Sequence, residues 1–376
     1  RSPPEIRLDM IRPARRHCPP GGPAGSSAAI PAAQAGRSVL ILEKRRVPGN
    51  RQICAEGISR TGLTDVYPEI PDSWIAAPIE GAVLISPFGK RVTVNHPRAG
   101  YILERRVFDR DLFRMAASAG ARTVTDCRVL GLHRGDDGSV TGVVAEYRGE
   151  RRIFRAEIII DASGVESSVT GEILPGENLT ARGIHVAAGA VVAGIDVRLG
   201  YPEFYVGRNI APGGYAWVFP KGKDYANVGV GINPSTEKSG KTAWEYLRDF
   251  VEKRCPDGRV IELTGGNVPT AKRLPEIAVD NVLFAGDAGR LTDPVSGGGL
   301  ATAVLSGKMA GEAAVRALDS PDNMESLLGD YERDWKRSLG RKMSFYYQVK
   351  KIFGRLPDEE LEGICALIDE RFGRGE

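Results

Sequence analysis

The chain has 376 residues, of which 42% are hydrophobic and 26% are charged, and its formal net charge is +3. This length allows two domains around a sizeable core, and the composition is that of an ordinary folded protein. The small net charge excludes a strongly basic surface, so we expect no nucleic-acid partner.

Cysteine usage and hydropathy restrict the class further. The five cysteines are scattered along the chain, and no two have the spacing of a zinc site or a redox pair. We therefore expect no metal and a reducing, cytoplasmic location. No apolar run is as long as a transmembrane helix, and the N-terminus lacks the apolar core of a signal peptide.

The first glycine-rich segment follows an anomalous beginning. Residues 1–20 are rich in Pro and Arg and contain no apolar run, so we expect the first strand to be missing or altered. Residues 21–27 (GGPAGSS) precede an Ala-rich helix and an apolar run that ends at Glu43. This order is typical of a dinucleotide-binding βαβ unit, in which Gly22 and Gly25 lie at the phosphates and Glu43 accepts from a ribose hydroxyl.

Two prolines depart from this pattern. Pro20 stands where a glycine is expected in the tight turn, and Pro31 lies inside the predicted helix, where it would cost about 3 kcal/mol. Either the nucleotide site is real but altered, or the coding frame changes upstream of about Pro20. The second explanation is favoured because the motif recovers within a few residues, although it does not account for Pro31.

The next segments carry two candidate site residues. Residues 48–63 form a polar loop with the sequence Cys-Ala-Glu-Gly at 54–57, where Cys54 is either a small buried side chain or part of a site. Residues 101–117 predict a strand end and an amphipathic helix that carries Arg105, either as a solvated cation or as a cofactor contact. Three β-like runs over 124–160 predict a meander, after which Ile-Ile-Ile-Asp-Ala-Ser-Gly at 158–164 returns to the main sheet.

From about residue 180 to 269 the sequence is rich in β-like runs separated by Gly and Pro, which predicts a mostly antiparallel sheet. Tyr215, Trp217 and Phe219 alternate in the sequence YAWVFPK and should face one side. They form either an ordinary hydrophobic sheet face or the wall of a cavity.

The stretch 282–312 is the strongest signal in the chain. A short apolar strand ends in Gly-Asp-Ala, which places Asp287 at the carboxyl end of the strand, where α/β sheets bind ligands. Gly297 to Gly299 then open a helix whose N–H groups suit an anionic ring or a diphosphate. The combination favours a nucleotide site over an ordinary strand-turn-helix unit. From Asp319 onward the chain is helical, and Phe345 to Phe353 with Lys350 and Lys351 fits either a helix on anionic lipid or a packed C-terminal helix.

Together these motifs resemble those of the geranylgeranyl reductases, a family of the FAD-dependent hydroxylase-like superfamily. The resemblance spans residues 21–357, and the Cys-x-Glu-Gly loop and the Tyr-x-Trp-x-Phe-Pro-Lys strand are its most specific parts. It implies an α/β fold like that of p-hydroxybenzoate hydroxylase, in which a Rossmann-like FAD-binding domain with an inserted β-meander joins an antiparallel-sheet substrate domain. We assign residues 21–179 and 270–320 to the first domain, 180–269 to the second, and 321–376 to a C-terminal helical segment.

The resemblance also implies residue roles. The implied FAD-binding residues are Gly22, Ala24, Gly25, Glu43, Lys44, Cys54, Ala55, Gly57, Arg105, Asp287, Gly298, Gly299 and Leu300. Within this set, Asp287 would contact the ribityl chain, Arg105 the adenosine side, and Cys54 the flavin ring. The implied substrate-binding residues are Tyr215, Trp217 and Phe219, and the candidate proton donors are Cys54 and Tyr215.

Within the family the chain is similar to the archaeal digeranylgeranylglycerophospholipid reductases, which saturate the chains of membrane lipids. The implied reaction takes hydride from reduced flavin and a proton from the protein, and the implied electron donor is reduced ferredoxin or NAD(P)H. Two alternatives stay open. One is a flavin-dependent monooxygenase or halogenase on the same fold, since fold does not fix function. The other is a non-enzyme that no longer binds FAD because its first strand is altered.

Overall fold

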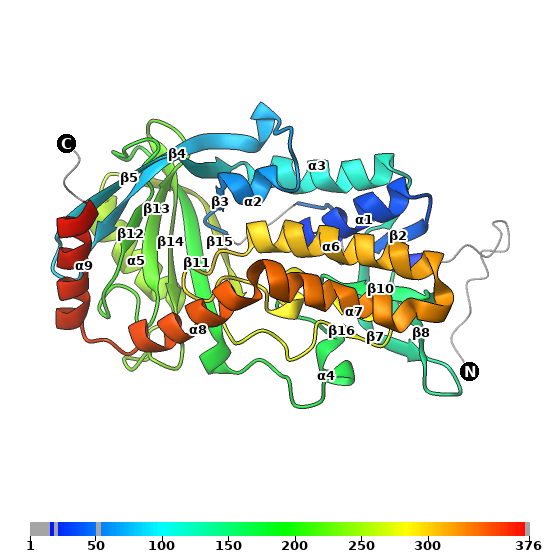
Figure 1. Ribbon diagram of the computed structural model, residues 1–376. Coiled ribbons are helices and arrows are strands. Elements are labelled where there is room, and N and C mark those ends of the chain that lie inside the picture. Colours follow the sequence, from blue (N-terminus) through cyan, green and yellow to red (C-terminus); the bar gives the residue numbers. More distant parts are fainter. Residues whose placement is uncertain (1–15, 19–21, 50–53, 373–376) are drawn as a thin grey trace.

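The computed structural model describes residues 16–18, 22–49 and 54–372 as two large sheets with helices packed around them (Figure 1). The first sheet has the strand order β16-β17-β10-β1-β2-β6. Its strands are β16 Ala278–Val279, β17 Val282–Phe284, β10 Ile158–Asp161, β1 Arg16–Cys18, β2 Ser38–Leu42 and β6 Arg122–Val124. All neighbours pair in parallel except β16 and β17, so this is the expected mixed, mainly parallel sheet.

The first strand, which was expected to be missing or altered, is present over the three residues of β1. The backbone of β1 fills the slot between β2 and β10, with His17 in register with Val39 and Ile158. Without it, the facing N–H and C=O groups of two central strands would be buried without partners. Backbone pairing needs no apolar side chains, and this is why the hydrophobic pattern did not reveal the strand.

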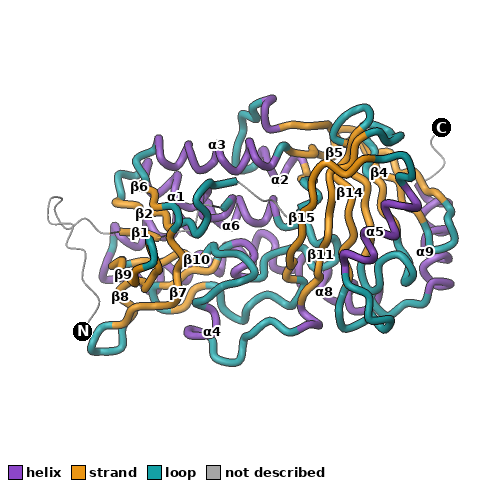
Figure 2. The backbone as a smooth tube through the Cα atoms, turned by 180° about the vertical axis from the view of Figure 1, so that it is seen from behind, coloured by secondary structure: helices purple, strands orange, loops and turns teal. Residues whose placement is uncertain are grey.

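The second sheet has eight strands in the order β15-β11-β14-β13-β12-β4-β5-β3 (Figure 2). They are β15 Arg259–Pro269, β11 Ile184–Ala193, β14 Tyr225–Ile232, β13 Tyr215–Pro220, β12 Glu203–Tyr205, β4 Ile75–Ile85, β5 Arg91–Leu103 and β3 Gly57–Ser59. The expected antiparallel pairing is confirmed except between β12 and β4, which are parallel. Strands β3 to β5 come from the segment assigned to the FAD-binding domain but hydrogen-bond into this sheet. The assignment of whole domains stays a prediction.

A third sheet contains β7 Cys127–Arg134, β8 Val140–Tyr147 and β9 Glu150–Arg155, which confirms the meander. The helices are α1 Pro23–Gln34, α2 Arg60–Thr64, α3 Arg105–Ser118, α4 Thr170–Ile173, α5 Ala243–Arg254, α6 Leu300–Asp319, α7 Met324–Trp335, α8 Arg341–Phe353 and α9 Asp358–Phe372. Helix α1 continues through Pro31, because its Ala-rich faces are buried and this packing offsets the lost hydrogen bond. Among the described helices, none combines the length and the apolar composition needed to span a bilayer.

The two faces of the eight-stranded sheet have different partners. One face packs on α5, where Tyr246, Leu247 and Phe250 join the apolar side chains of β11, β13 and β14. The opposite face carries Trp217 and Phe219 and is directed toward the parallel sheet and the N-termini of α1 and α6. This arrangement leaves a space between the sheets, and the candidate site lies there.

Candidate active site

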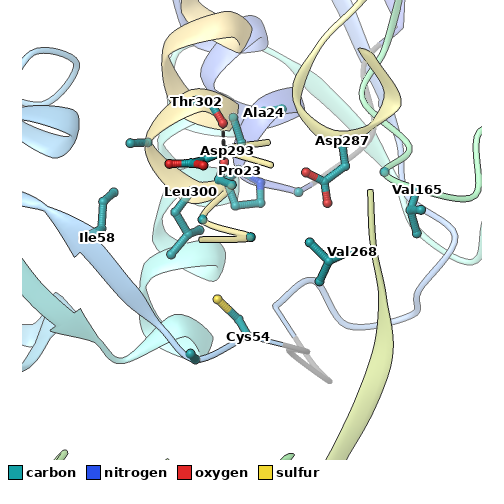
Figure 3. Close-up of a pocket in the computed structure, with 18 of the residues that line it drawn as sticks. Pro23, Ala24, Cys54, Ile58, Val165, Val268, Asp287, Asp293, Leu300 and Thr302 are labelled. Carbon is teal, nitrogen blue, oxygen red and sulfur yellow. Dashed lines mark hydrogen bonds between the residues drawn. The ribbon is translucent and has the colours of Figure 1, made fainter. Parts of the chain in front are cut away.

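A cavity of about 1110 Å³ lies between the two sheets and is lined by residues of both (Figure 3). A typical site for one small molecule has about 300–1,000 Å³, so this cavity has room for more than one ligand of ordinary size. One end is formed by the starts of α1 and α6 and by loops of the parallel sheet, and the other by the aromatic face of the eight-stranded sheet.

Two helix starts face the first end of the cavity. Gly22 precedes α1 and Gly299 precedes α6, and no described side chain caps either helix or places an acidic group in its first turn. A Cβ at Gly22 would meet no atom within 4 Å, so space is open beside the first turn of α1. Uncapped N–H groups at the positive end of a helix dipole bind anions, which suits a diphosphate.

Asp287 lies beside these helix starts and lines the cavity (Figure 3), and a Cβ at Gly299 would lie 3.1 Å from its Oδ1. It belongs to the short turn Gly286–Gly289 directly after β17, as the sequence predicted. Its Oδ1 accepts a hydrogen bond from Thr292 Oγ1 at 2.6 Å. Burial raises the pKa of the Asp287 carboxyl, while the Thr292 bond and the charge of Arg105 lower it in part. The carboxylate can still accept from a ligand hydroxyl through its other oxygen.

Glu43 follows β2 at the same edge of the parallel sheet, as predicted. It is buried, and its Oε1 accepts from the Arg45 N–H at 2.8 Å. The neighbouring Lys44 pairs with Glu166 at 2.9 Å, and both Glu43 and Lys44 line the cavity. An acidic side chain at the end of the second strand is where a βαβ unit binds ribose hydroxyls.

The Cys-Ala-Glu-Gly loop is held by a buried polar network that sequence reasoning missed. Lys221 Nζ donates to Glu56 Oε2 at 2.8 Å and lies 3.1 Å from a Glu104 oxygen. Asn227 Nδ2 donates to the Cys54 carbonyl at 2.8 Å and to Glu56 Oε2 at 3.1 Å. Trp217 Nε1 donates to Asn227 Oδ1 at 2.9 Å and thereby orients that amide. Two motifs far apart in sequence, the cysteine loop and the Tyr-x-Trp-x-Phe-Pro-Lys strand, are therefore one structural unit.

The backbone conformation of this loop and its close contact with Phe219 explain why position 57 is a glycine. Glu56 has a φ of 71°, a conformation that costs free energy for a residue with a side chain, and its two ionic and amide contacts maintain it. A Cβ at Gly57 would lie 3.0 Å from the ring of Phe219. The glycine therefore lets the aromatic strand approach the loop closely.

The Cys54 thiol points into the cavity toward Leu300 (Figure 3). Its Sγ accepts from the Glu56 N–H at 3.1 Å. Burial raises the pKa of Cys54, and the nearby Arg105 guanidinium opposes this shift. Arg105 is itself buried and forms a two-pronged ion pair with Asp109, with distances of 2.7 and 2.9 Å. Cys54 and Arg105 are thus neighbours, and the separate cofactor contacts implied for them stay predictions.

The aromatic residues of β13 face one side, as the alternation predicted. Phe204 of β12 completes the group, with ring centroids 5.6 Å from Tyr215 and 5.2 Å from Phe219. Trp217 lies over Gly229, its cross-strand partner, where a Cβ would lie 2.1 Å from the indole. The four aromatic side chains line the cavity and form an apolar wall opposite the helix starts.

Tyr215 has its hydroxyl engaged at this wall. It donates a hydrogen bond to the Ser296 carbonyl, in the turn that precedes α6. Burial raises the pKa of Tyr215, as do the nearby Cys54 and Asp293. The phenol therefore keeps its proton at neutral pH.

His185 is a second site residue that the sequence did not indicate. It lies on β11 in register with Val268, is buried, and lines the cavity. Its Nε2 has no hydrogen-bond partner among the described residues, while the other ring nitrogen bonds the Gly213 backbone. Burial and the nearby Lys350 lower the pKa of His185 to about 4. The ring is therefore neutral, and its buried Nε2 has an unused lone pair.

Every residue that was assigned to cofactor or substrate lines this cavity, with one exception. Gly25 lies within α1 and is buried against its surroundings, away from the cavity surface. Lining residues that the sequence did not indicate also come from the C-terminal helices, among them Leu339, Lys342, Met343 and Tyr346. The described residues contain no group of His, Cys, Asp and Glu side chains that could hold a metal ion.

These features fit a dinucleotide at the first end of the cavity. The observation that tests the fit is the pairing of two uncapped helix starts with two carboxylates, that of half-buried Asp287 and that of buried Glu43, all of which line one open space. Carboxylates there suit the hydroxyl groups of a ribose or ribityl chain, and the N–H groups suit phosphate or a flavin carbonyl. The same space continues to the apolar wall, where an apolar ligand would be held.

Comparison with known proteins gives the same result. Residues 21–166 match the family model described as FAD dependent oxidoreductase, and residues 183–268 match the geranylgeranyl reductase catalytic domain. The digeranylgeranylglycerophospholipid reductase of Methanosarcina acetivorans is 40% identical over 355 residues, which cover 93% of this chain and 87% of the relative.

Solved structures support the fold. A geranylgeranyl bacteriochlorophyll reductase-like protein from Thermoplasma acidophilum has a TM-score of 0.89 and 32% identity, and the match covers 95% of this chain and 91% of that one. A flavin-dependent brominase, Bmp2, in a triple-mutant form, has a TM-score of 0.72 at 18% identity, with 94% of each chain covered, and shows the fold alone. The chain therefore belongs to the geranylgeranyl reductase family and is an FAD-dependent oxidoreductase.

Proposed function

We propose that this protein saturates the isoprenoid double bonds of digeranylgeranylglycerophospholipids, the precursors of saturated archaeal membrane lipids. One observation carries the proposal: a single cavity has helix starts and carboxylates that suit a dinucleotide at one end and an apolar aromatic wall at the other. The names of relatives at 36–40% identity support this substrate. The brominase likeness is confined to the fold, so it does not favour halogenation.

The chemistry accounts for both ends of the cavity. An isolated trisubstituted alkene has no neighbouring carbonyl to take up charge, so its reduction requires hydride at one carbon and a proton at the other. Bound FAD supplies the hydride in its reduced form. The protein orients the alkene: Trp217 and Phe219 exclude water and fix the alkene between the wall and the helix starts.

We propose Cys54 as the proton donor, with Tyr215 as the alternative. Burial raises the pKa of both groups, so each carries its proton at neutral pH. The Tyr215 proton already bonds the Ser296 carbonyl, whereas the Cys54 sulfur acts as an acceptor, from the Glu56 N–H and from the Arg105 side chain. The thiol proton can therefore turn to a ligand without breaking a bond to the protein. Cys54→Ser and Tyr215→Phe distinguish the two, because only the true donor's loss should slow alkene reduction while FAD stays bound.

We propose three candidate electron donors for the flavin, namely reduced ferredoxin, another carrier and NAD(P)H. The deciding experiment follows the flavin spectrum without oxygen. The protein is loaded with FAD, reduced with dithionite, and mixed with a digeranylgeranyl lipid dispersed in detergent. We expect the oxidised flavin bands to return as saturated lipid forms. Reoxidation by oxygen alone would indicate a monooxygenase or halogenase, and failure to retain FAD would indicate a non-enzyme.

A further inference from the structure

Helix α8 separates the cavity from the protein surface. Lys342, Met343 and Tyr346 of this helix line the cavity, and Lys350 Nζ is turned inward, where it donates to the Thr270 carbonyl at 2.6 Å. The other face of the same turns is exposed. Phe345 and Ile352, two turns apart on this face, are 64% and 60% exposed. The wall of the cavity and an apolar surface therefore lie on opposite sides of one helix.

The charge of α8 is of one sign. Its sequence, RKMSFYYQVKKIF, contains no Asp or Glu. Arg341, Lys342 and Lys351 of α8, and Arg355 directly after it, have no ion-pair partner among the described residues. The next helix, α9, carries six carboxylates and packs along β5. An anionic surface would thus attract α8 and repel α9.

We propose that the exposed face of α8 docks on an anionic lipid bilayer. The inference rests on the proposed function, because a membrane lipid must leave the bilayer to reach the cavity. An interfacial helix combines exposed aromatic and aliphatic side chains with lysine and arginine, which is the composition of this face. Docking there would bring the wall of the cavity that contains Lys342 and Tyr346 next to the bilayer.

A second exposed apolar patch provides a matched control. Ile261 and Leu263 on the edge strand β15 are 65% and 61% exposed, close to the values for Phe345 and Ile352. If any exposed apolar pair produced vesicle binding, changes at the two patches would have equal effects. The proposal predicts that they differ.

The experiment measures co-sedimentation of the FAD-loaded protein with vesicles of phosphatidylcholine, alone or mixed with an equal part of phosphatidylglycerol. We expect binding to the mixed vesicles that falls as salt is added. Each cation near an anionic surface contributes about fivefold, so Lys351→Glu with Arg355→Glu should weaken binding at least about 25-fold. Phe345→Ser with Ile352→Ser should also abolish most binding, whereas Ile261→Ser with Leu263→Ser should leave it unchanged.

Reduction of detergent-dispersed lipid is measured on the same variants and should be unchanged, because none of the substituted residues lines the cavity. Equal vesicle binding by the parent and the charge-reversed variant would overturn the α8 proposal, as would equal losses at α8 and β15. Absence of lipid reduction in a parent protein that binds vesicles would instead overturn the proposed function alone.

Discussion

The buried ion pair between Lys221 and Glu56 tests how the Cys54 loop is held. Both side chains are less than 10% exposed, and the Glu56 carboxylate also accepts from Asn227 Nδ2 and from the Arg105 N–H. Lys221→Met removes the cation but keeps the length of the side chain. Loss of one partner of a buried pair leaves an uncompensated charge and costs about 3–5 kcal/mol.

The expected effect can be expressed as a melting temperature. At about 2.1 cal/mol/K of unfolding entropy per residue, 1 kcal/mol shifts the midpoint of this 376-residue chain by about 1.3 °C. Lys221→Met should therefore lower the midpoint by about 4–6 °C. Lys241→Met breaks a pair of similar length, 2.9 Å to Asp249, whose side chains are 45% and 40% exposed. That control should lower the midpoint far less, because solvent screens an exposed ion pair.

A charge-neutral double variant separates lost charge balance from lost packing. Lys221→Met combined with Glu56→Gln leaves no buried charge, so it should be more stable than Lys221→Met alone. The assay is thermal unfolding followed by circular dichroism, together with the FAD content of each purified variant. If Lys221→Met melts within about 1 °C of Lys241→Met, the buried pair does not hold the loop and our reasoning is wrong.

Three further predictions address the cofactor, pH and helix packing. Asp287→Asn should weaken FAD binding about 10- to 100-fold in a fluorescence titration, because a hydrogen bond to a charged group contributes about 1.5–3 kcal/mol. The folded-state pKa of His185 is about 4 against an ordinary 6.5, so the unfolded chain takes up the proton first and stability falls as the pH drops between these values. Between about pH 7 and pH 5, His185 should lower the unfolding free energy of the parent protein by about 2 kcal/mol. The His185→Gln variant should lack this part of the decrease, measured by urea titration. Gly307→Ala should destabilise by about 1–3 kcal/mol, because its Cβ would lie 2.1 Å from the Ala24 carbonyl, whereas Gly363→Ala on open surface should not destabilise.

Local patterns predicted much of the fold. The alternation in β13 gave the aromatic face, and the amphipathic pattern within residues 101–117 gave α3, which ends one residue later at Ser118. The turn with Asp287 and the helix start at Leu300 were also found where predicted. In each of these cases the signal and the structure lie within one short segment.

The parts that sequence reasoning missed depend on partners far apart in the chain. Glu56 and Lys221 are 165 residues apart, and each alone resembles an ordinary surface charge. His185 is a single histidine in an apolar strand, and only its position in the sheet makes it a lining residue of the cavity. The β1 strand is determined by the unfilled slot between β2 and β10 and not by its own side chains.

The close contact of α1 and α6 explains why two helix starts serve one site. A Cβ at Gly307 or Gly311 would lie about 2 Å from the carbonyl of Ala24 or Ala28, so the backbones of the two helices touch (Figure 1). Because both residue numbers increase by four between these contacts, the helices run in the same direction, and both positive ends point toward the cavity. Helix α6 begins seven residues before Gly307 and α1 only one residue before Ala24, so the two starts are staggered by about 9 Å at 1.5 Å per residue. We predict that this stagger lets one start bind the diphosphate of FAD while the other faces the flavin ring. The small residues of α1 and α6, which look like ordinary helix formers in the sequence, thus set the spacing of the two helix starts.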